Sequence, residues 1–255
     1  MLLMAFLTAC GSSPTDSQPQ DIGEGRPMLF IGNSHSYNRD VPGILQALAD
    51  SSGDKLAVLT VAGANLALID HWNLGTAEQV IRSRAWEFVV MQQGWTPAGV
   101  CQDTLRLAAR NFEGAIRAAG AIPALFQVWP GSSQAAQYQG TIESYRLAAR
   151  DVNGMLFPVA EAWRALAERD PTVNLYLDGL HANDAGAYLS ALVMYARVFN
   201  ETPVGLPATI RTRSGIIISV PASLAATLQE IAAEIGLAPT PDEEPVAQPV
   251  ITSRC

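Results

Sequence analysis

The chain has 255 residues, of which 49% are hydrophobic and 16% are charged. This length is enough for one large domain with its own core, which excludes a disordered or fibrous chain. The net charge of -8, from 16 basic and 24 acidic residues, has the wrong sign for binding phosphate backbones and argues against nucleic acid as a partner.

Residues 1–10 form a short apolar run that ends at Cys10, with Leu-Thr-Ala directly before it. This run resembles a bacterial lipoprotein signal with its lipobox. The resemblance implies cleavage before Cys10, lipidation of that residue, and export to the cell envelope, where the lipid anchors the protein to a membrane. Residues 11–26 are rich in Ser, Pro, Gln, Asp and Gly and are predicted to be a flexible linker.

Between residues 27 and 237, short apolar runs alternate with amphipathic segments. The runs predict strands at 28–31, 56–61, 87–92, 122–128 and 154–158, and the segments predict helices at 42–51, 76–84, 102–119, 135–151, 184–199 and 222–236. Strands without polar alternation are buried on both faces, which favours a parallel sheet between two helical layers, an α/β domain over 27–237. Residues 238–255 are rich in Pro and acidic residues and are predicted to be a disordered tail.

A candidate catalytic residue, Ser34, lies where the first predicted strand ends, in the sequence Gly32-Asn33-Ser34. Ligands of parallel sheets bind at the carboxyl ends of the strands. A glycine followed by two small polar residues can expose the Ser34 hydroxyl near free N–H groups of a helix, which suits a nucleophile. The same residues could instead serve only as a helix cap, so this interpretation needs a partner elsewhere in the chain.

That partner is predicted at Asp178 and His181, three residues apart in a tight loop before the helix at 184–199. At this spacing the carboxylate can hold one imidazole nitrogen while the other faces outward, as a general base requires. A surface histidine in a capped turn is the alternative for this loop alone. A serine after the first strand together with a late Asp-x-x-His is more specific than either part.

The two motifs, Gly-Asn-Ser around Ser34 and Asp-Gly-Leu-His ending at His181, resemble the first and last sequence blocks of the SGNH (GDSL-like) hydrolases. These esterases have a three-layer, flavodoxin-like fold, so the resemblance implies a central parallel sheet of about five strands. It implies Ser34 as nucleophile, His181 as base and Asp178 as the carboxylate that orients the base. It requires no metal and no cofactor, and the expected activity is that of a serine esterase that forms an acyl-enzyme.

The resemblance also implies an oxyanion hole made by the backbone N–H groups of Ser34 and Gly63 and by one side-chain amide. The family normally takes this amide from an Asn after the third strand, but this chain has Gln92 and Gln93 there. A Gln amide can donate the same hydrogen bond. Gln92 is favoured because it directly follows the apolar run, and Gln93 remains the alternative.

We expect Asn33, His35, His71 and Trp95 to contribute to substrate binding, because aromatic and amide side chains near strand ends are typical of a carbohydrate cleft. The expected substrate is a small acyl ester, most simply an acetyl ester, of a small molecule or a carbohydrate. The alternative is a lipid-anchored binding protein of the same fold without turnover, since fold does not determine function. An α/β-hydrolase is disfavoured because position 36 is Ser, whereas its nucleophile motif requires Gly there.

Overall fold

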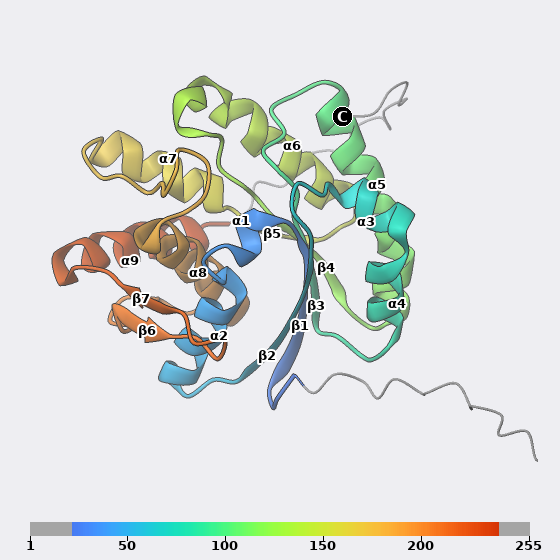
Figure 1. Cartoon of the computed structure of the whole chain (residues 1–255), viewed down its shortest axis with the longest axis horizontal. Coiled ribbons are helices and arrows are strands. Elements are labelled where there is room, and N and C mark those ends of the chain that lie inside the picture. Colours follow the sequence, from blue (N-terminus) through green and yellow to red (C-terminus); the bar gives the residue numbers. More distant parts are fainter. Residues whose placement is uncertain (1–21, 240–255) are drawn as a thin grey trace, which may run out of the picture.

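The computed structural model describes residues 22–239 and contains a five-stranded, fully parallel sheet (Figure 1). Its strands lie in the order β2-β1-β3-β4-β5. Their bounds are β1 (Arg26–Gly32), β2 (Leu56–Ala62), β3 (Phe88–Met91), β4 (Ile122–Phe126) and β5 (Met155–Phe157). The predicted parallel α/β architecture is therefore confirmed.

Helices cover both faces of the sheet. In Figure 1 the sheet is seen nearly edge-on, with α2, α8 and α9 on one side and α3, α4 and α5 on the other. α8 packs against α2 and α9, and α5 packs against α3 and α6. The helices are α1 (Ser34–Tyr37), α2 (Val41–Ser52), α3 (Leu68–Leu74), α4 (Thr76–Arg82), α5 (Val100–Ala118), α6 (Tyr138–Asp151), α7 (Val159–Arg169), α8 (Asp184–Phe199) and α9 (Ala222–Gly236).

The central strand β1 is buried from both faces. Met28, Leu29, Phe30 and Ile31 each have at most 1% of their surface exposed. Consecutive side chains of a strand point to opposite faces, so a fully buried run needs an apolar helical layer on each side. This explains why the strands lack the polar alternation that a one-sided sheet would show.

The strand order creates a switch point next to β1. The chain passes from β1 to β2 on one side and then returns to β3 on the other side of β1. Ile31 lies opposite Val61 of β2 and Met91 of β3, so the three strands end at nearly the same level. The loops that follow them therefore start side by side, which is where open α/β sheets bind ligands.

Besides the four-residue helix α1, three further features of the structure were not predicted from the sequence. α3 has only seven residues, which is too short to display a helical period. α7 starts directly after Pro158 and lies outside the helices predicted from the sequence. The third is a small antiparallel hairpin of β6 (Thr209–Arg211) and β7 (Ile217–Ser219), whose strands have three residues each.

The predicted signal at 1–10, most of the linker at 11–26 and most of the tail at 238–255 lie outside the described residues. Within residues 22–239, no helix is long and apolar enough to span a membrane.

Candidate active site

The turn after β1 presents Ser34 as the first residue of the short helix α1. Asn33 is the N-cap of this helix, and its side-chain Oδ1 accepts the N–H of His35 at 3.1 Å. Gly32 suits the position before it, because a Cβ there would overlap the buried Oε1 of Gln92. Among the described residues, no acceptor bonds the N–H of Ser34, so this donor is free for a ligand.

A second tight loop, before α8, holds Asp178 and His181. Oδ1 of Asp178 accepts the backbone N–H groups of Leu180 at 3.0 Å and His181 at 2.7 Å. Gly179 has a φ of +85°, which allows the chain to turn inside this loop. The indole Nε1 of Trp129 donates to the carbonyl of Leu180 at 2.9 Å and so fixes the loop to the core.

The structure brings Ser34, His181 and Asp178 together as a hydrogen-bonded chain, although 147 positions separate Ser34 from His181 in the sequence. Nε2 of His181 lies 2.9 Å from Oγ of Ser34, and Nδ1 of His181 lies 2.7 Å from Oδ2 of Asp178. Hydrogen bonds from the ring and the backbone of His181 lower the pKa of Asp178 well below its usual range. The carboxylate thus stays ionised and can orient the imidazole as a general base.

A cavity of about 300 Å³ opens beside Ser34. None of the residues that line it is an Asp, Glu, Lys or Arg. They are Asn33, Ser34, His35, Asn65, Leu66, Ala67, Gln93, Gly94, Trp95, Thr96 and Leu180. The cavity is therefore suited to an uncharged group that is partly apolar and partly able to form hydrogen bonds.

Gln93 lines this cavity, whereas Gln92 does not. Gln92 is fully buried, and its Nε2 donates to Oδ1 of Asn33 at 2.9 Å and to the carbonyl of Gln93. Because both of its N–H groups are used, Gln92 has no side-chain donor left for a substrate, and this geometry favours the alternative, Gln93, as the amide donor. Nε2 of Gln93 donates to Oγ1 of Thr96 at 3.2 Å, which leaves one N–H unused.

Gly63 and His71 are also engaged inside the protein. The N–H of Gly63 donates to the carbonyl of Gly32 at 3.2 Å, so the expected oxyanion donor at this position is already occupied. Nε2 of His71 donates to the same carbonyl at 2.8 Å, and the side chain is buried and does not line the cavity. Both residues support the turn that carries Ser34, and His71 is not placed to bind a substrate.

His35 lines the cavity as a buried, neutral imidazole. Asn33 uses its side-chain N–H to donate to Leu66, so its Oδ1 is an acceptor and Nδ1 of His35 carries the proton in the 3.1 Å bond between them. Burial, followed by the nearby charge of His181, lowers the pKa of His35 to about 4. The ring packs edge-on against Trp129 at 5.4 Å between centroids, so His35 forms part of the cavity wall.

Trp95 lines the cavity, and its Nε1 donates to Oε1 of Gln137 at 2.8 Å. Trp129 is instead fully buried and stacks on Trp163 with 3.8 Å between ring centroids. Of these three tryptophans, Trp95 is therefore the one placed to contact a ligand in the cavity.

Two supporting residues were missed by the sequence analysis. Trp129 holds the loop of His181, as described above. The hydroxyl of Tyr145 in α6 donates to the carbonyl of Gln93 at 2.7 Å and accepts its N–H at 3.2 Å. No local motif marks Tyr145, because 52 positions separate it from Gln93 and only the packing of α6 brings them together.

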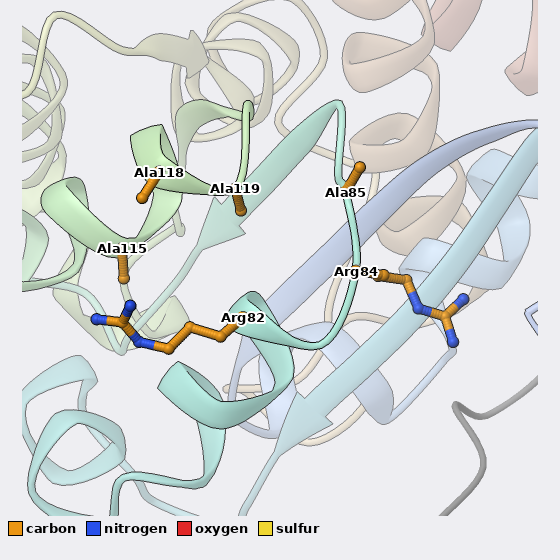
Figure 2. A pocket seen from close by; sticks show the side chains of 6 residues that line it. All are labelled: Arg82, Arg84, Ala85, Ala115, Ala118 and Ala119. Atoms are coloured by element: carbon orange, nitrogen blue, oxygen red, sulfur yellow. The ribbon is translucent and has the colours of Figure 1, made fainter.

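Another hollow, of about 400 Å³, lies near the amino ends of β3 and β4. It is lined by Arg82, Arg84 and four alanines, and Figure 2 shows that the two arginine side chains point in different directions. Arg82 bonds Glu78 at 2.7 Å, and Arg84 lies over the ring of Trp86. This hollow therefore offers no converging polar groups comparable to those around Ser34.

Within residues 22–239, no group of three or more His, Cys, Asp or Glu side chains is arranged to hold a metal ion.

No family model matches the sequence, and no curated protein is significantly similar to it. Solved structures do match. A protein from Slackia heliotrinireducens described as a candidate SGNH hydrolase superposes with a TM-score of 0.56 at 25% identity, over 68% of this chain and 98% of the other. A lipase/acylhydrolase from Enterococcus faecalis gives 0.54 at 15% identity, over 69% and 96% of the two chains. A candidate GDSL-like lipase from Parabacteroides merdae gives 0.52 at 13% identity, over 71% and 99%.

The matches cover nearly the whole of each solved chain, so the similarity extends over a complete domain and not over a single motif. It agrees with the five-stranded parallel sheet. The described part of the chain therefore has an α/β fold similar to that of SGNH/GDSL hydrolases, and these neighbours support that family for it.

Proposed function

We propose that this protein is a serine esterase that hydrolyses small acyl esters, most simply acetyl esters, through Ser34, His181 and Asp178. The observation that carries the proposal is the 2.9 Å contact between Nε2 of His181 and Oγ of Ser34, with Asp178 at 2.7 Å on the other ring nitrogen. Nucleophile, base and orienting carboxylate in hydrogen-bond contact are the arrangement that acyl transfer requires.

In the proposed reaction, Oγ of Ser34 attacks the ester carbonyl carbon while Nε2 of His181 takes the hydroxyl proton. The carbonyl electron pair moves to oxygen, which the N–H of Ser34 and the amide of Gln93 stabilise. His181 then returns its proton to the leaving alcohol. Water, activated by the same imidazole, releases the acid from Ser34 and restores the free hydroxyl.

The cavity supports an uncharged substrate. Its volume of about 300 Å³ and its lack of Asp, Glu, Lys and Arg favour a small acyl group over a long chain or a charged one. The aromatic ring of Trp95 in the cavity wall suits contact with the apolar face of a sugar ring, which favours an alcohol such as a carbohydrate. We therefore propose an acetylated carbohydrate as the substrate class.

The test is the hydrolysis of p-nitrophenyl acetate by the protein and by its Ser34→Ala variant. We expect turnover in the protein and a loss of at least about 1000-fold in the variant. Ser83→Ala is the matched control, because Ser83 is exposed at the end of α4 and bonds only the carbonyl of Val80. Equal rates in all three proteins, or no turnover in any of them, would favour a binding protein without catalysis.

We also propose that the protein is exported and attached to the bacterial cell envelope through a lipid on Cys10. The support is the sequence before this residue, which lies outside the described residues. Growth with a radiolabelled fatty acid tests it, since label should enter the protein and be lost in Cys10→Ala. A variant that still incorporates label would contradict the anchor and leave the esterase proposal unaffected.

A further inference from the structure

The loop that follows β2 is attached to the turn that carries Ser34. The N–H of Gly63 donates to the carbonyl of Gly32 at 3.2 Å, and Nδ2 of Asn33 donates to the carbonyl of Leu66 at 3.0 Å. A bond from the N–H of Leu66 to the carbonyl of Gly63 closes the loop on itself at 3.3 Å. The two residues between these attachment points are thereby held next to the nucleophile turn.

One of these two residues, Asn65, lines the same cavity as Ser34. Its backbone φ is +59°, a left-handed conformation that Asn adopts more readily than most residues. Within residues 22–239, the side chain of Asn65 has no hydrogen-bond partner. Both of its amide N–H groups are consequently available to a bound molecule, in contrast to those of the other amides at this site.

The other candidate donors are partly or wholly used. The N–H of Gly63 donates to Gly32, and the two side-chain N–H groups of Gln92 donate to Asn33 and Gln93. Gln93 has one N–H left after its bond to Thr96. A tetrahedral oxyanion is stabilised best by several hydrogen-bond donors. The free donors identified so far are the N–H of Ser34 and one N–H of Gln93, so the oxyanion can accept a hydrogen bond from a third donor.

We propose that the side-chain amide of Asn65 donates a hydrogen bond to the oxyanion that forms when Ser34 attacks the ester. The proposal rests on the esterase function proposed above. In this step the bond from Oγ of Ser34 to the carbonyl carbon forms, the carbonyl electron pair moves to oxygen, and the hydroxyl proton goes to His181. Asn65 transfers no proton and takes the place that Gly63 cannot fill.

The first variant for the test is Asn65→Gly, because Gly retains the left-handed backbone and removes only the amide. We expect kcat for p-nitrophenyl acetate to fall by about 100- to 1000-fold while KM stays within about twofold. The second variant, Asn65→Asp, retains the shape of the side chain but replaces the donor by an acceptor, and kcat should fall at least as far. Asn153→Gly is the matched control, since Asn153 also has a positive φ of 43° but lies between α6 and β5.

A second measurement separates an oxyanion donor from a residue that only shapes the loop. The thiono analogue of the ester develops its charge on sulfur, which is a weaker hydrogen-bond acceptor than oxygen. Loss of a donor should reduce the preference for the oxygen ester over the thiono ester by about tenfold, whereas a distorted site would slow both esters equally.

The two proposals fail in different ways. Ser34-dependent turnover with Asn65→Gly and Asn65→Asp both within about twofold of the original kcat would overturn the role of Asn65 alone. An equal loss on oxygen and thiono esters would overturn it as well. Absence of any Ser34-dependent turnover in the unchanged protein would overturn the esterase proposal and this inference with it.

Discussion

Gln92 binds Asn33, the residue before Ser34, through both ends of its side-chain amide. Its Oε1 accepts the backbone N–H of Asn33 at 2.9 Å, and its Nε2 donates to Oδ1 of Asn33 at 2.9 Å. The same Oε1 accepts the hydroxyl of Ser36 at 2.8 Å. The buried amide of Gln92 therefore joins the turn that carries Ser34 to the end of β3.

Replacing the side-chain amide of Gln92 by a hydrocarbon should destabilise the protein. In Gln92→Leu, the buried N–H of Asn33 and the buried hydroxyl of Ser36 lose their acceptor, and each such group costs about 1–3 kcal/mol. We expect the free energy of unfolding in urea to fall by about 2–6 kcal/mol. Gln79→Leu on the exposed surface of α4 should change it by less than about 0.5 kcal/mol. Equal stability of the two variants would contradict the role of Gln92.

Asp178 should affect the rate far more than the fold. In Asp178→Asn, Nδ1 of His181 loses its charged acceptor, and the imidazole is no longer held in the tautomer that accepts the proton of Ser34. We expect kcat to fall by about 10,000-fold, the effect of the same change in a Ser-His-Asp triad, with little change in melting temperature. A loss smaller than about tenfold would show that His181 is oriented without this carboxylate.

The sheet was predictable from the sequence because strands buried on both faces appear in it as uninterrupted apolar runs. Phe30 and its neighbours in β1 are apolar without interruption, and such a run is explained only by helices on both faces. The hairpin of β6 and β7 has no such run buried on both faces. In each of its strands only the middle residue, Ile210 or Ile218, is buried, and one buried residue cannot define a period.

The roles of single groups in the site were harder to predict, because they depend on register and packing. The N–H of Gly63 is bonded because the pairing of β1 with β2 continues to the end of both strands. Whether Gln92 or Gln93 faces the cavity depends on one step of side-chain alternation at the end of β3. Motifs close in sequence, such as Asp178 with His181, were predictable since a tight loop alone fixes their contact.

The buried imidazole of His35 should make stability depend on pH. Its pKa is lowered from 6.5 to about 4, mainly by burial, so between these values the unfolded chain binds a proton that the folded protein does not. The contribution of His35 to the free energy of unfolding is therefore largest above about pH 6.5. It falls by about 3 kcal/mol in total as the pH decreases toward 4. We expect unfolding in urea to show this decline between pH 7 and about pH 4.5.

The variant His35→Phe isolates this contribution. It retains a ring in the cavity wall but carries no titrating group, so the decline should become shallower by about 2–3 kcal/mol over the same range. Burial also lowers the pKa of His71, which leaves a residual slope of the same sign. The pKa of Asp178 lies below this range and adds nothing to the slope. An unchanged slope in the variant would contradict the assignment to His35.

The ion pair between α5 and α6 should be the most sensitive charged contact away from the active site. Asp151 bonds Arg106 through both carboxylate oxygens, at 2.7 and 2.9 Å, and these side chains are only 9% and 4% exposed. Asp151→Asn leaves the guanidinium of Arg106 buried without a counter-charge, which costs about 3–5 kcal/mol. The exposed pair of Glu78 and Arg82 is the control, and Glu78→Gln should cost about 0.3–0.5 kcal/mol. Urea unfolding measures both, and similar losses would mean that water reaches Arg106 and solvates its charge.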